Sequence, residues 1–202
     1  MNFLAHLYLA CLPEGQARYD EELLVGNFIA DSVKGSKYQL FSPTISRGIL
    51  MHREVDYFSD HNPFYLQSVH QLQPAYGKYS GVITDMFYDY FLAANWNSYS
   101  SVDLRKFCDD AYLILTSHQE SMPEESRIIL EYMSNHDWLY SYRETEGIRR
   151  ALNGMSKRMK YYFPMDNAVQ ELEKNSSIYL RHFSEFFPLL VEHTKQYTDL
   201  HA

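Results

Sequence analysis

The stretch Ser42-Pro-Thr-Ile-Ser-Arg-Gly-Ile-Leu-Met-His-Arg-Glu-Val-Asp-Tyr-Phe-Ser-Asp60 decides the fold class, because it carries a complete helix signal. A serine followed by a proline is typical of a helix start: the serine side chain caps free N–H groups, and proline fits the first helical position. Asn62-Pro63 ends the helix, since the residue before a proline disfavours helical dihedral angles. The sequence therefore predicts a long helix from Ser42 to about Asp60.

Similar signals recur on both sides of this helix, and no segment alternates as a strand does. The apolar segment from Met1 to Leu12 predicts a buried first helix. Asp20 as N-cap and Gly35 as stop predict a second helix over 21–34. These predictions place two helices before Ser42.

The chain after Asn62 also carries helix signals. A helix is expected from Ser80 or Thr84 to Trp96, and further helices should start at Ser101, Pro123, Thr145 and Asp166. Pro188 should kink or break the last long helix. Because the loops are short and no composition shift marks a linker, we expect residues 1–202 to form a single all-α domain, a bundle of about eight to ten helices.

The composition restricts the partners. The chain has 18 Lys and Arg residues against 26 Asp and Glu residues, a net charge of −8. Nucleic acid is therefore not expected as a partner, because binding its phosphates needs a basic surface. A bound cation would still allow an anionic substrate. Cys11 and Cys108 form no motif, and the chain shows neither a signal peptide nor the roughly 20 apolar residues of a membrane span, so we expect a cytoplasmic protein.

The strongest local feature lies within the opening stretch. His52, Asp56 and Asp60 are spaced four residues apart, so consecutive members share one face of a helix. One imidazole and two carboxylates form a ligand set that suits Mn²⁺, Fe²⁺ or Zn²⁺ better than Mg²⁺. The alternative is a polar surface stripe. Arg53 lies beside the cluster and would hold a phosphate oxygen or, alternatively, form a simple ion pair.

Other segments carry weaker signals. Asp85 and Asp89 share one face of an aromatic helix, and they either bind metal or mark its solvent side. Asn27 and Asp31 also share a face, and Asn27 is a candidate to orient a phosphate or a water molecule. The interior Gly26 suggests a close approach of another element, since glycine costs about 1 kcal/mol in a helix. His6 lies on an apolar helix, where a core histidine is the alternative to a ligand.

Two further features concern polar segments in the second half. His136-Asp137 is a literal His-Asp pair, but it stands apart from the other acids, and we interpret Asp137 as a helix cap. Arg149, Arg150, Lys157 and Lys160 fall within about a 100° arc of a helix. This basic patch predicts docking of an acidic protein, and a solvated helix face is the alternative.

Five segments, taken in order, resemble the acyl carrier protein phosphodiesterase family. They are Met1-Asn-Phe-Leu-Ala-His-Leu-Tyr-Leu-Ala10, Gly26-Asn-Phe-Ile-Ala-Asp31, Gly48-Ile-Leu-Met-His-Arg-Glu-Val-Asp56 continuing to Asp60, Thr84-Asp-Met-Phe-Tyr-Asp-Tyr-Phe-Leu92 with Trp96, and Ala151-Leu-Asn-Gly-Met155 followed by Arg158. Each is modest alone, but their order and spacing span nearly the whole chain. The family is a divergent branch of the all-helical HD-type metal phosphohydrolases.

This resemblance implies hydrolysis of 4′-phosphopantetheine from the serine of holo acyl carrier protein, with Mn²⁺ as the usual ion. Carried onto this sequence, the resemblance implies seven candidate ligands: His6, Asp31, His52, Asp56, Asp60, Asp85 and Asp89. Among them we predict His6, Asp31, His52, Asp85 and Asp89 as metal ligands. Asp56 and Asp60 are predicted as catalytic groups, together with Arg53 and Asn27 from the patterns above. Unlike ordinary HD proteins, the chain lacks an adjacent His-Asp pair there. Two alternatives stay open: a metal-dependent phosphatase or phosphodiesterase acting on a nucleotide or other small phosphoester, and a helical interaction protein with an inactive site.

Overall fold

The computed structural model describes residues 1–12 and 19–201, and every regular element within these ranges is helical. This confirms the all-α prediction. The α-helices are α1 (Phe3–Ala10), α2 (Glu21–Ile29), α3 (Pro43–His61), α4 (Pro63–Tyr76), α5 (Ser80–Ala94), α6 (Leu104–Ser117), α7 (Glu124–Asn135), α8 (Trp138–Ser141), α9 (Thr145–Lys157), α10 (Ala168–Lys174) and α11 (Ser176–Leu200). The described chain thus has slightly more α-helices than expected, and α8 is a single turn.

Capping explains why several helices start where the sequence predicts. The side chains of Asp20 and Ser42 accept hydrogen bonds from the third residue after each of them. Asn62, which was expected only to end α3, also caps the unpredicted α4 by accepting a hydrogen bond from the N–H of Phe64. Such side chains satisfy N–H groups that the first helical turn leaves free. The start expected at Ser101 lies two residues later, where Asp103 caps α6.

One predicted helix end was wrong, and a predicted break is absent. The helix predicted over 21–34 ends at Ile29 and tightens into a 3-10 turn, Ala30–Ser32, because Asp and Ser favour turns over helix interiors. Pro188 does not break α11, which continues through it from Ser176 to Leu200. Pro188 and Ser184 are both exposed. The Ser184 carbonyl that loses its N–H partner therefore faces solvent, and buried neighbours such as Phe187 hold the helix in place.

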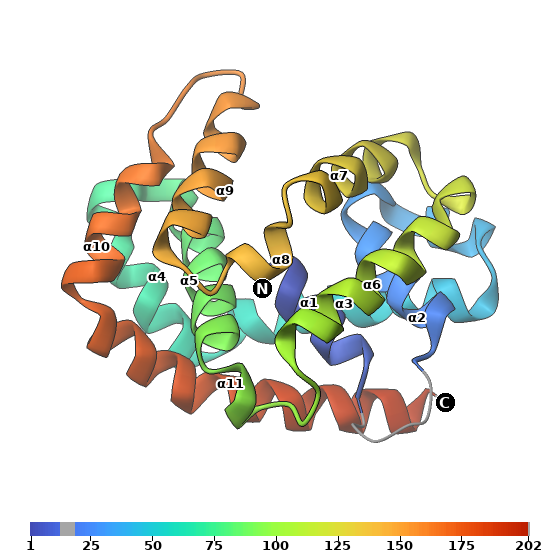
Figure 1. Cartoon of the computed structure of the whole chain (residues 1–202). Coiled ribbons are helices and arrows are strands. Elements are labelled where there is room, and N and C mark those ends of the chain that lie inside the picture. The colour runs from blue at the N-terminus through green and yellow to red at the C-terminus, as the bar shows by residue number, and fades with distance from the viewer. Residues whose placement is uncertain (13–18, 202) are drawn as a thin grey trace.

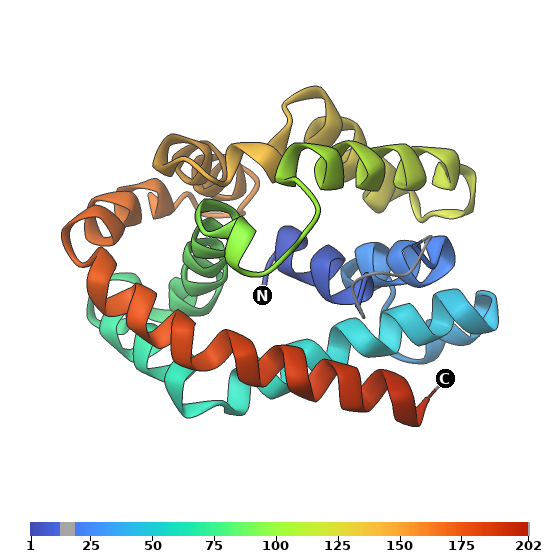
Figure 2. The same cartoon turned by 60° about the horizontal axis from the view of Figure 1, so that its bottom comes forward.

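The helices surround α1, whose residues Leu4–Ala10 are all buried. Figures 1 and 2 show α11 running along one side of the bundle, and it packs against α3, α4 and α5. Phe183, Phe186 and Phe187 of α11 join the aromatic core around Tyr88 of α5. None of the described helices combines the length and apolar character needed to cross a membrane.

Helices α2 and α3 cross at two glycines. A Cβ atom on Gly26 would lie 2.1 Å from the carbonyl oxygen of Ile45, and one on Gly48 would lie 2.3 Å from that of Leu23. The close approach expected from the interior Gly26 is therefore present, and only glycine fits at either position. This contact fixes α2, which carries Asn27, against the face of α3 that carries His52.

Candidate metal centre

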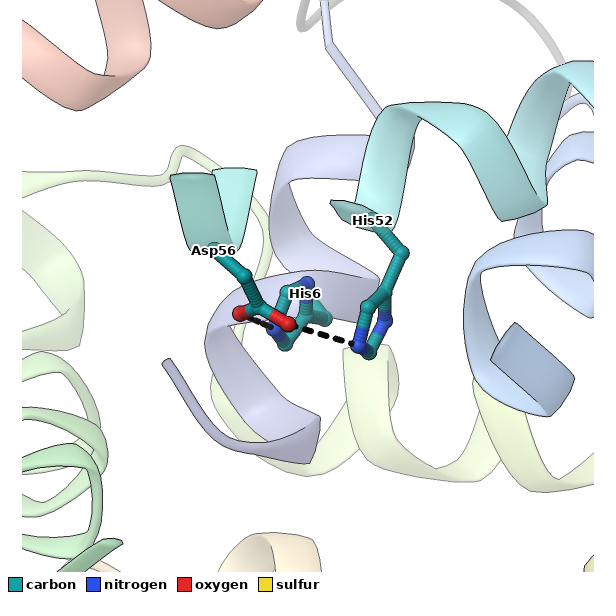
Figure 3. Close-up of side chains that lie close together, drawn as sticks. All are labelled: His6, His52 and Asp56. Carbon is teal, nitrogen blue, oxygen red and sulfur yellow. Dashed lines mark hydrogen bonds and ion pairs between the residues drawn. The ribbon is translucent and has the colours of Figure 1, made fainter. Parts of the chain in front are cut away.

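Three side chains from two helices converge on one point. His6 comes from α1, and His52 and Asp56 come from consecutive turns of α3 (Figure 3). The Nε2 atom of His6 lies 3.1 Å from Oδ1 of Asp56, and Nε2 of His52 lies 3.3 Å from Oδ2. One potential ligand atom from each residue lies within 4.8 Å of the others. Two imidazole nitrogens and a carboxylate at such separations match the donor set of a transition-metal site.

Asn27 orients His52. The Nδ1 atom of His52 lies 2.9 Å from the backbone oxygen of Asn27 and 3.3 Å from its side-chain oxygen. Because a carbonyl only accepts hydrogen bonds, Nδ1 carries the proton and Nε2 faces Asp56. Metal-binding histidines are held in this way by a second hydrogen bond. Asn27 is fully buried, so the structure places it behind the imidazole, where it positions His52.

The two imidazoles stack face to face, with ring centroids 3.7 Å apart and planes 7° apart. Burial, together with the positive charge of the neighbouring His52, lowers the pKa of His6 to about 4. Burial alone would also lower the pKa of His52, but hydrogen bonds to Asp31 and Asp56 outweigh it and raise the pKa to about 9. One neutral and one cationic imidazole therefore lie side by side in the metal-free protein. The donor set fits a divalent cation, which would take the place of that positive charge.

Asp31 offers a further oxygen at the edge of this group. It lies in the 3-10 turn after α2, and its Oδ1 atom is 3.5 Å from Nε2 of His52. Its carboxylate is largely exposed, so it can rotate toward a ligand without breaking a buried contact. The hydrogen bond with His52 lowers the pKa of Asp31 despite its partial burial. Asp31 and His52 were both predicted as ligands, and the structure brings them together.

Asp85 and Asp89 lie in other surroundings. Asp85 accepts a hydrogen bond from the Tyr65 hydroxyl at 2.7 Å and lies 3.0 Å from the amino nitrogen of Met1. Burial raises its pKa. Asp89 accepts hydrogen bonds from the backbone N–H groups of Leu4 and Ala5, and its burial raises the pKa to about 7. Both oxygens of Asp89 therefore hold the first turn of α1, and the structure does not bring this residue to the group around His52.

Arg53 and Asp60, both predicted as catalytic groups, lie in different surroundings. The guanidinium of Arg53 donates to the backbone oxygens of Val33 and Gly35, at 2.6 and 2.9 Å, and lies over the ring of Tyr38. It fastens the segment after α2 to α3. Asp60 lines a cavity whose wall also includes His52 and Asp56. The expected phosphate contact of Arg53 therefore has no support in its geometry, whereas Asp60 is accessible to a ligand.

This cavity has a volume of about 490 Å³ and collects residues from distant segments. Its polar lining includes Asp31, His52, Asp56, Asp60 and Asp85. Its apolar lining includes Phe3, Tyr65, Val82, Ile129 and Met155. Arg158, directly after α9, also lines it. Sequence reasoning assigned Arg158 no role in the site, although it directly follows the Ala151–Met155 motif.

The basic patch and the His-Asp pair lie apart from the histidines. Arg149 pairs with Glu146 and Glu173, at 3.2 and 3.7 Å, while Arg150 and Lys157 are exposed. Lys160 lies over the ring of Tyr161. Asp137 precedes α8 as the predicted cap, but its side chain makes no capping hydrogen bond and instead pairs with Arg105.

Comparison with known proteins identifies the family of the chain. The model of a family described as acyl carrier protein phosphodiesterase matches residues 1–190. A protein of that name from Photorhabdus laumondii is 29% identical over 193 residues, covering 95% of this chain and 94% of its own. Those from Enterobacter sp. strain 638 and Escherichia coli O6:H1 are also 29% identical, covering 96% and 95% of this chain and 98% and 96% of their own. No solved structure matches the chain. With a family model matched over nearly its whole length, the chain belongs to the acyl carrier protein phosphodiesterase family.

Proposed function

We propose that this protein hydrolyses the phosphodiester bond between 4′-phosphopantetheine and the serine of holo acyl carrier protein, using a divalent cation. The observation that carries this proposal is the convergence of His6, His52 and Asp56, two of which, His52 and Asp56, line a cavity large enough for a small ligand. The relatives carry the name of this activity, which supports the same substrate.

His6, His52 and Asp56 would hold the cation, with Asp31 as a further oxygen ligand. Mn²⁺ is the ion we propose, with Mg²⁺, Fe²⁺ or Zn²⁺ as alternatives; a mixed imidazole and carboxylate set disfavours Mg²⁺. A divalent cation in this position supplies Lewis acidity for phosphodiester hydrolysis near neutral pH. Metal loading requires a proton to leave His52, and the Asn27 carbonyl keeps its Nε2 atom directed at the site.

The remaining polar groups of the cavity would transfer protons between the attacking water and the leaving serine oxygen. Asp60 lines the cavity and is exposed, so it can accept a proton from the attacking water. Asp85 also lines the cavity, where Tyr65 and the amino group of Met1 hold it, and it would pass a proton to the leaving serine oxygen. Asp89 acts at a distance by fixing α1, which carries His6.

The exposed cations of α9 would dock the carrier protein. Acyl carrier proteins are acidic, and Arg150 and Lys157 lie on the helix whose residue Met155 lines the cavity. Arg149 and Lys160 have local partners and contribute less. Reversing Arg150 and Lys157 to Glu should raise KM for holo acyl carrier protein and leave turnover of a small phosphodiester unchanged. Equal losses on both substrates would indicate misfolding and contradict the docking role.

Mass spectrometry of holo acyl carrier protein tests the reaction itself. Incubation with the protein and Mn²⁺ should remove the 4′-phosphopantetheine mass, and the His52→Ala variant should leave the carrier protein intact. A panel of nucleotides and small phosphoesters is assayed beside it. Hydrolysis of panel compounds but not of holo acyl carrier protein would show that the proposed substrate is wrong. Absence of both Mn²⁺ binding and hydrolysis would identify an inactive interaction protein. The free thiols of Cys11 and Cys108 fit the cytoplasmic location that this substrate requires.

A further inference from the structure

We propose that Arg158 is the side chain that binds the phosphate group of the substrate, facing the metal centre across the cavity. This inference rests on the proposed function and adds a residue to it. Arg158 follows the last turn of α9, whereas His6 and His52 come from α1 and α3. Figure 1 shows α9 and α3 in different parts of the bundle, and the cavity is lined from both.

The charge of the cavity calls for such a residue. Asp31, Asp56, Asp60 and Asp85 all line it, and their carboxylates repel a phosphodiester anion. A bound divalent cation offsets part of this charge at the histidine end. Among the described lining residues, Arg158 is the only arginine or lysine. The other cation of the lining, the amino group of Met1, already pairs with Asp56 and Asp85. Arg158 is therefore the side chain left to attract the anion.

The surroundings of Arg158 leave its guanidinium available. Arg53 donates to backbone oxygens, Arg105 pairs with Asp137, and Arg149 pairs with Glu146. Arg158 forms no ion pair with any carboxylate of the described chain within 4.0 Å.

Trp138 positions this guanidinium without occupying its N–H groups. The central carbon of the guanidinium lies 6.0 Å from the centroid of the indole ring. The guanidinium N–H groups donate no hydrogen bond to another residue of the described chain, so they stay free for a phosphate oxygen. A lysine in this position would offer a point charge, but it would lack the fork that binds two phosphate oxygens at once.

Binding of inorganic phosphate to the Mn²⁺-loaded protein tests this role without any turnover. Isothermal titration calorimetry compares the wild type with Arg158→Gln and Arg158→Lys. The control is Arg127→Gln, which removes an exposed arginine of α7 two residues before the cavity residue Ile129. Mn²⁺ affinity and the melting temperature are measured for each variant, to separate anion binding from metal loading and folding.

We expect Arg158→Gln to weaken phosphate binding about 10- to 100-fold, the range for a hydrogen-bonded charge. Arg158→Lys should recover part of the loss, and Arg127→Gln should match the wild type. Mn²⁺ affinity should stay unchanged in all three. Phosphate affinity that is equal in Arg158→Gln and the wild type, or an equal loss in Arg127→Gln, would overturn the proposal.

The same variants keep this inference separate from the proposed reaction. If the wild type fails to release 4′-phosphopantetheine while Arg158→Gln still loses phosphate affinity, the reaction is wrong and the anion site stands. If the wild type hydrolyses holo carrier protein and Arg158→Gln raises KM for both that substrate and a small phosphodiester, the two proposals support each other. Unchanged kinetics in Arg158→Gln would remove Arg158 from the site and leave the reaction in place.

Discussion

The crossing of α2 and α3 makes the substitution Gly26→Ala a strong test of how the site is built. The added Cβ atom would lie 2.1 Å from the carbonyl oxygen of Ile45 and 3.0 Å from the Cα atom of Gly48. Cβ atoms in proteins essentially never come closer than 3.0 Å to another heavy atom, so the first contact is too short by 0.9 Å. Both opposing atoms belong to the backbone. The helices therefore have to separate, because no side chain can rotate away.

The cost of this separation can be set against the gain in helix propensity. Overpacking a close contact costs about 1–3 kcal/mol, and we expect the upper end because rigid backbones oppose each other. Alanine gains about 1 kcal/mol over glycine in a helix, which leaves a net loss of about 2 kcal/mol. In a chain of this size, the loss should lower the melting temperature by about 4–8 °C.

The same movement should reach the metal centre. Asn27 follows Gly26, and its backbone oxygen holds Nδ1 of His52 at 2.9 Å. Loss of such an orienting contact lowers metal affinity about 10- to 100-fold. Circular dichroism melts and Mn²⁺ titration calorimetry measure the two effects on the same sample.

Gly154→Ala is the matched control. Gly154 also lies within a helix, and a Cβ atom there would have no other heavy atom within 4 Å. This variant should melt at or slightly above the wild-type temperature and bind Mn²⁺ normally. If Gly26→Ala melted at the same temperature as Gly154→Ala and bound Mn²⁺ equally well, the helix crossing would not position His52.

Three further predictions concern the acids and the cation. Asp56→Asn should reduce Mn²⁺ affinity by more than about 100-fold, because it removes the carboxylate shared by both imidazoles, and calorimetry measures this directly. Mn²⁺ at about 100 times its Kd should stabilise the wild type by about 2.7 kcal/mol, seen as a higher melting temperature that EDTA reverses and that Asp56→Asn lacks. Asp89 should make stability depend on pH: its pKa rises from 3.8 to about 7 on folding, so its contribution is complete below pH 3.8 and is lost as the pH rises through 7. The melting temperature of the wild type minus that of Asp89→Asn should therefore fall between pH 4 and pH 7, and a constant difference would contradict this.

Helix starts were predictable because their signals are local. Asp20 and Ser42 each cap a helix by accepting a hydrogen bond from the residue three positions ahead. The start of α4 was missed because Asn62 was interpreted only as the end of α3, although its side chain also caps α4. Whether a proline interrupts a helix was less predictable, since the outcome depends on the tertiary surroundings of that proline. Pro188 lies on a solvent-exposed face where a missing hydrogen bond costs little, and the sequence around it does not reveal that exposure.

The candidate site was predictable to the extent that it lies on one helix. The four-residue spacing of His52 and Asp56 placed both on the same face of α3, as observed. His6 joined them only through the family resemblance, because its contact with Asp56 spans 50 residues. Asp89 was predicted as a ligand from its helix face, yet its role as the cap of α1 depends on an equally distant contact. Arg158 was noted only at the end of a family-like segment and was given no role, because nothing local distinguishes a cation that faces a cavity.

The capping of α1 by Asp89 bears on how the nascent chain folds. An eight-residue helix is unstable in water by itself, and α1 leaves the ribosome well before α5 is translated. The segment around His6 therefore has no stable helical structure until Asp89, whose carboxylate holds its first turn, has been synthesised.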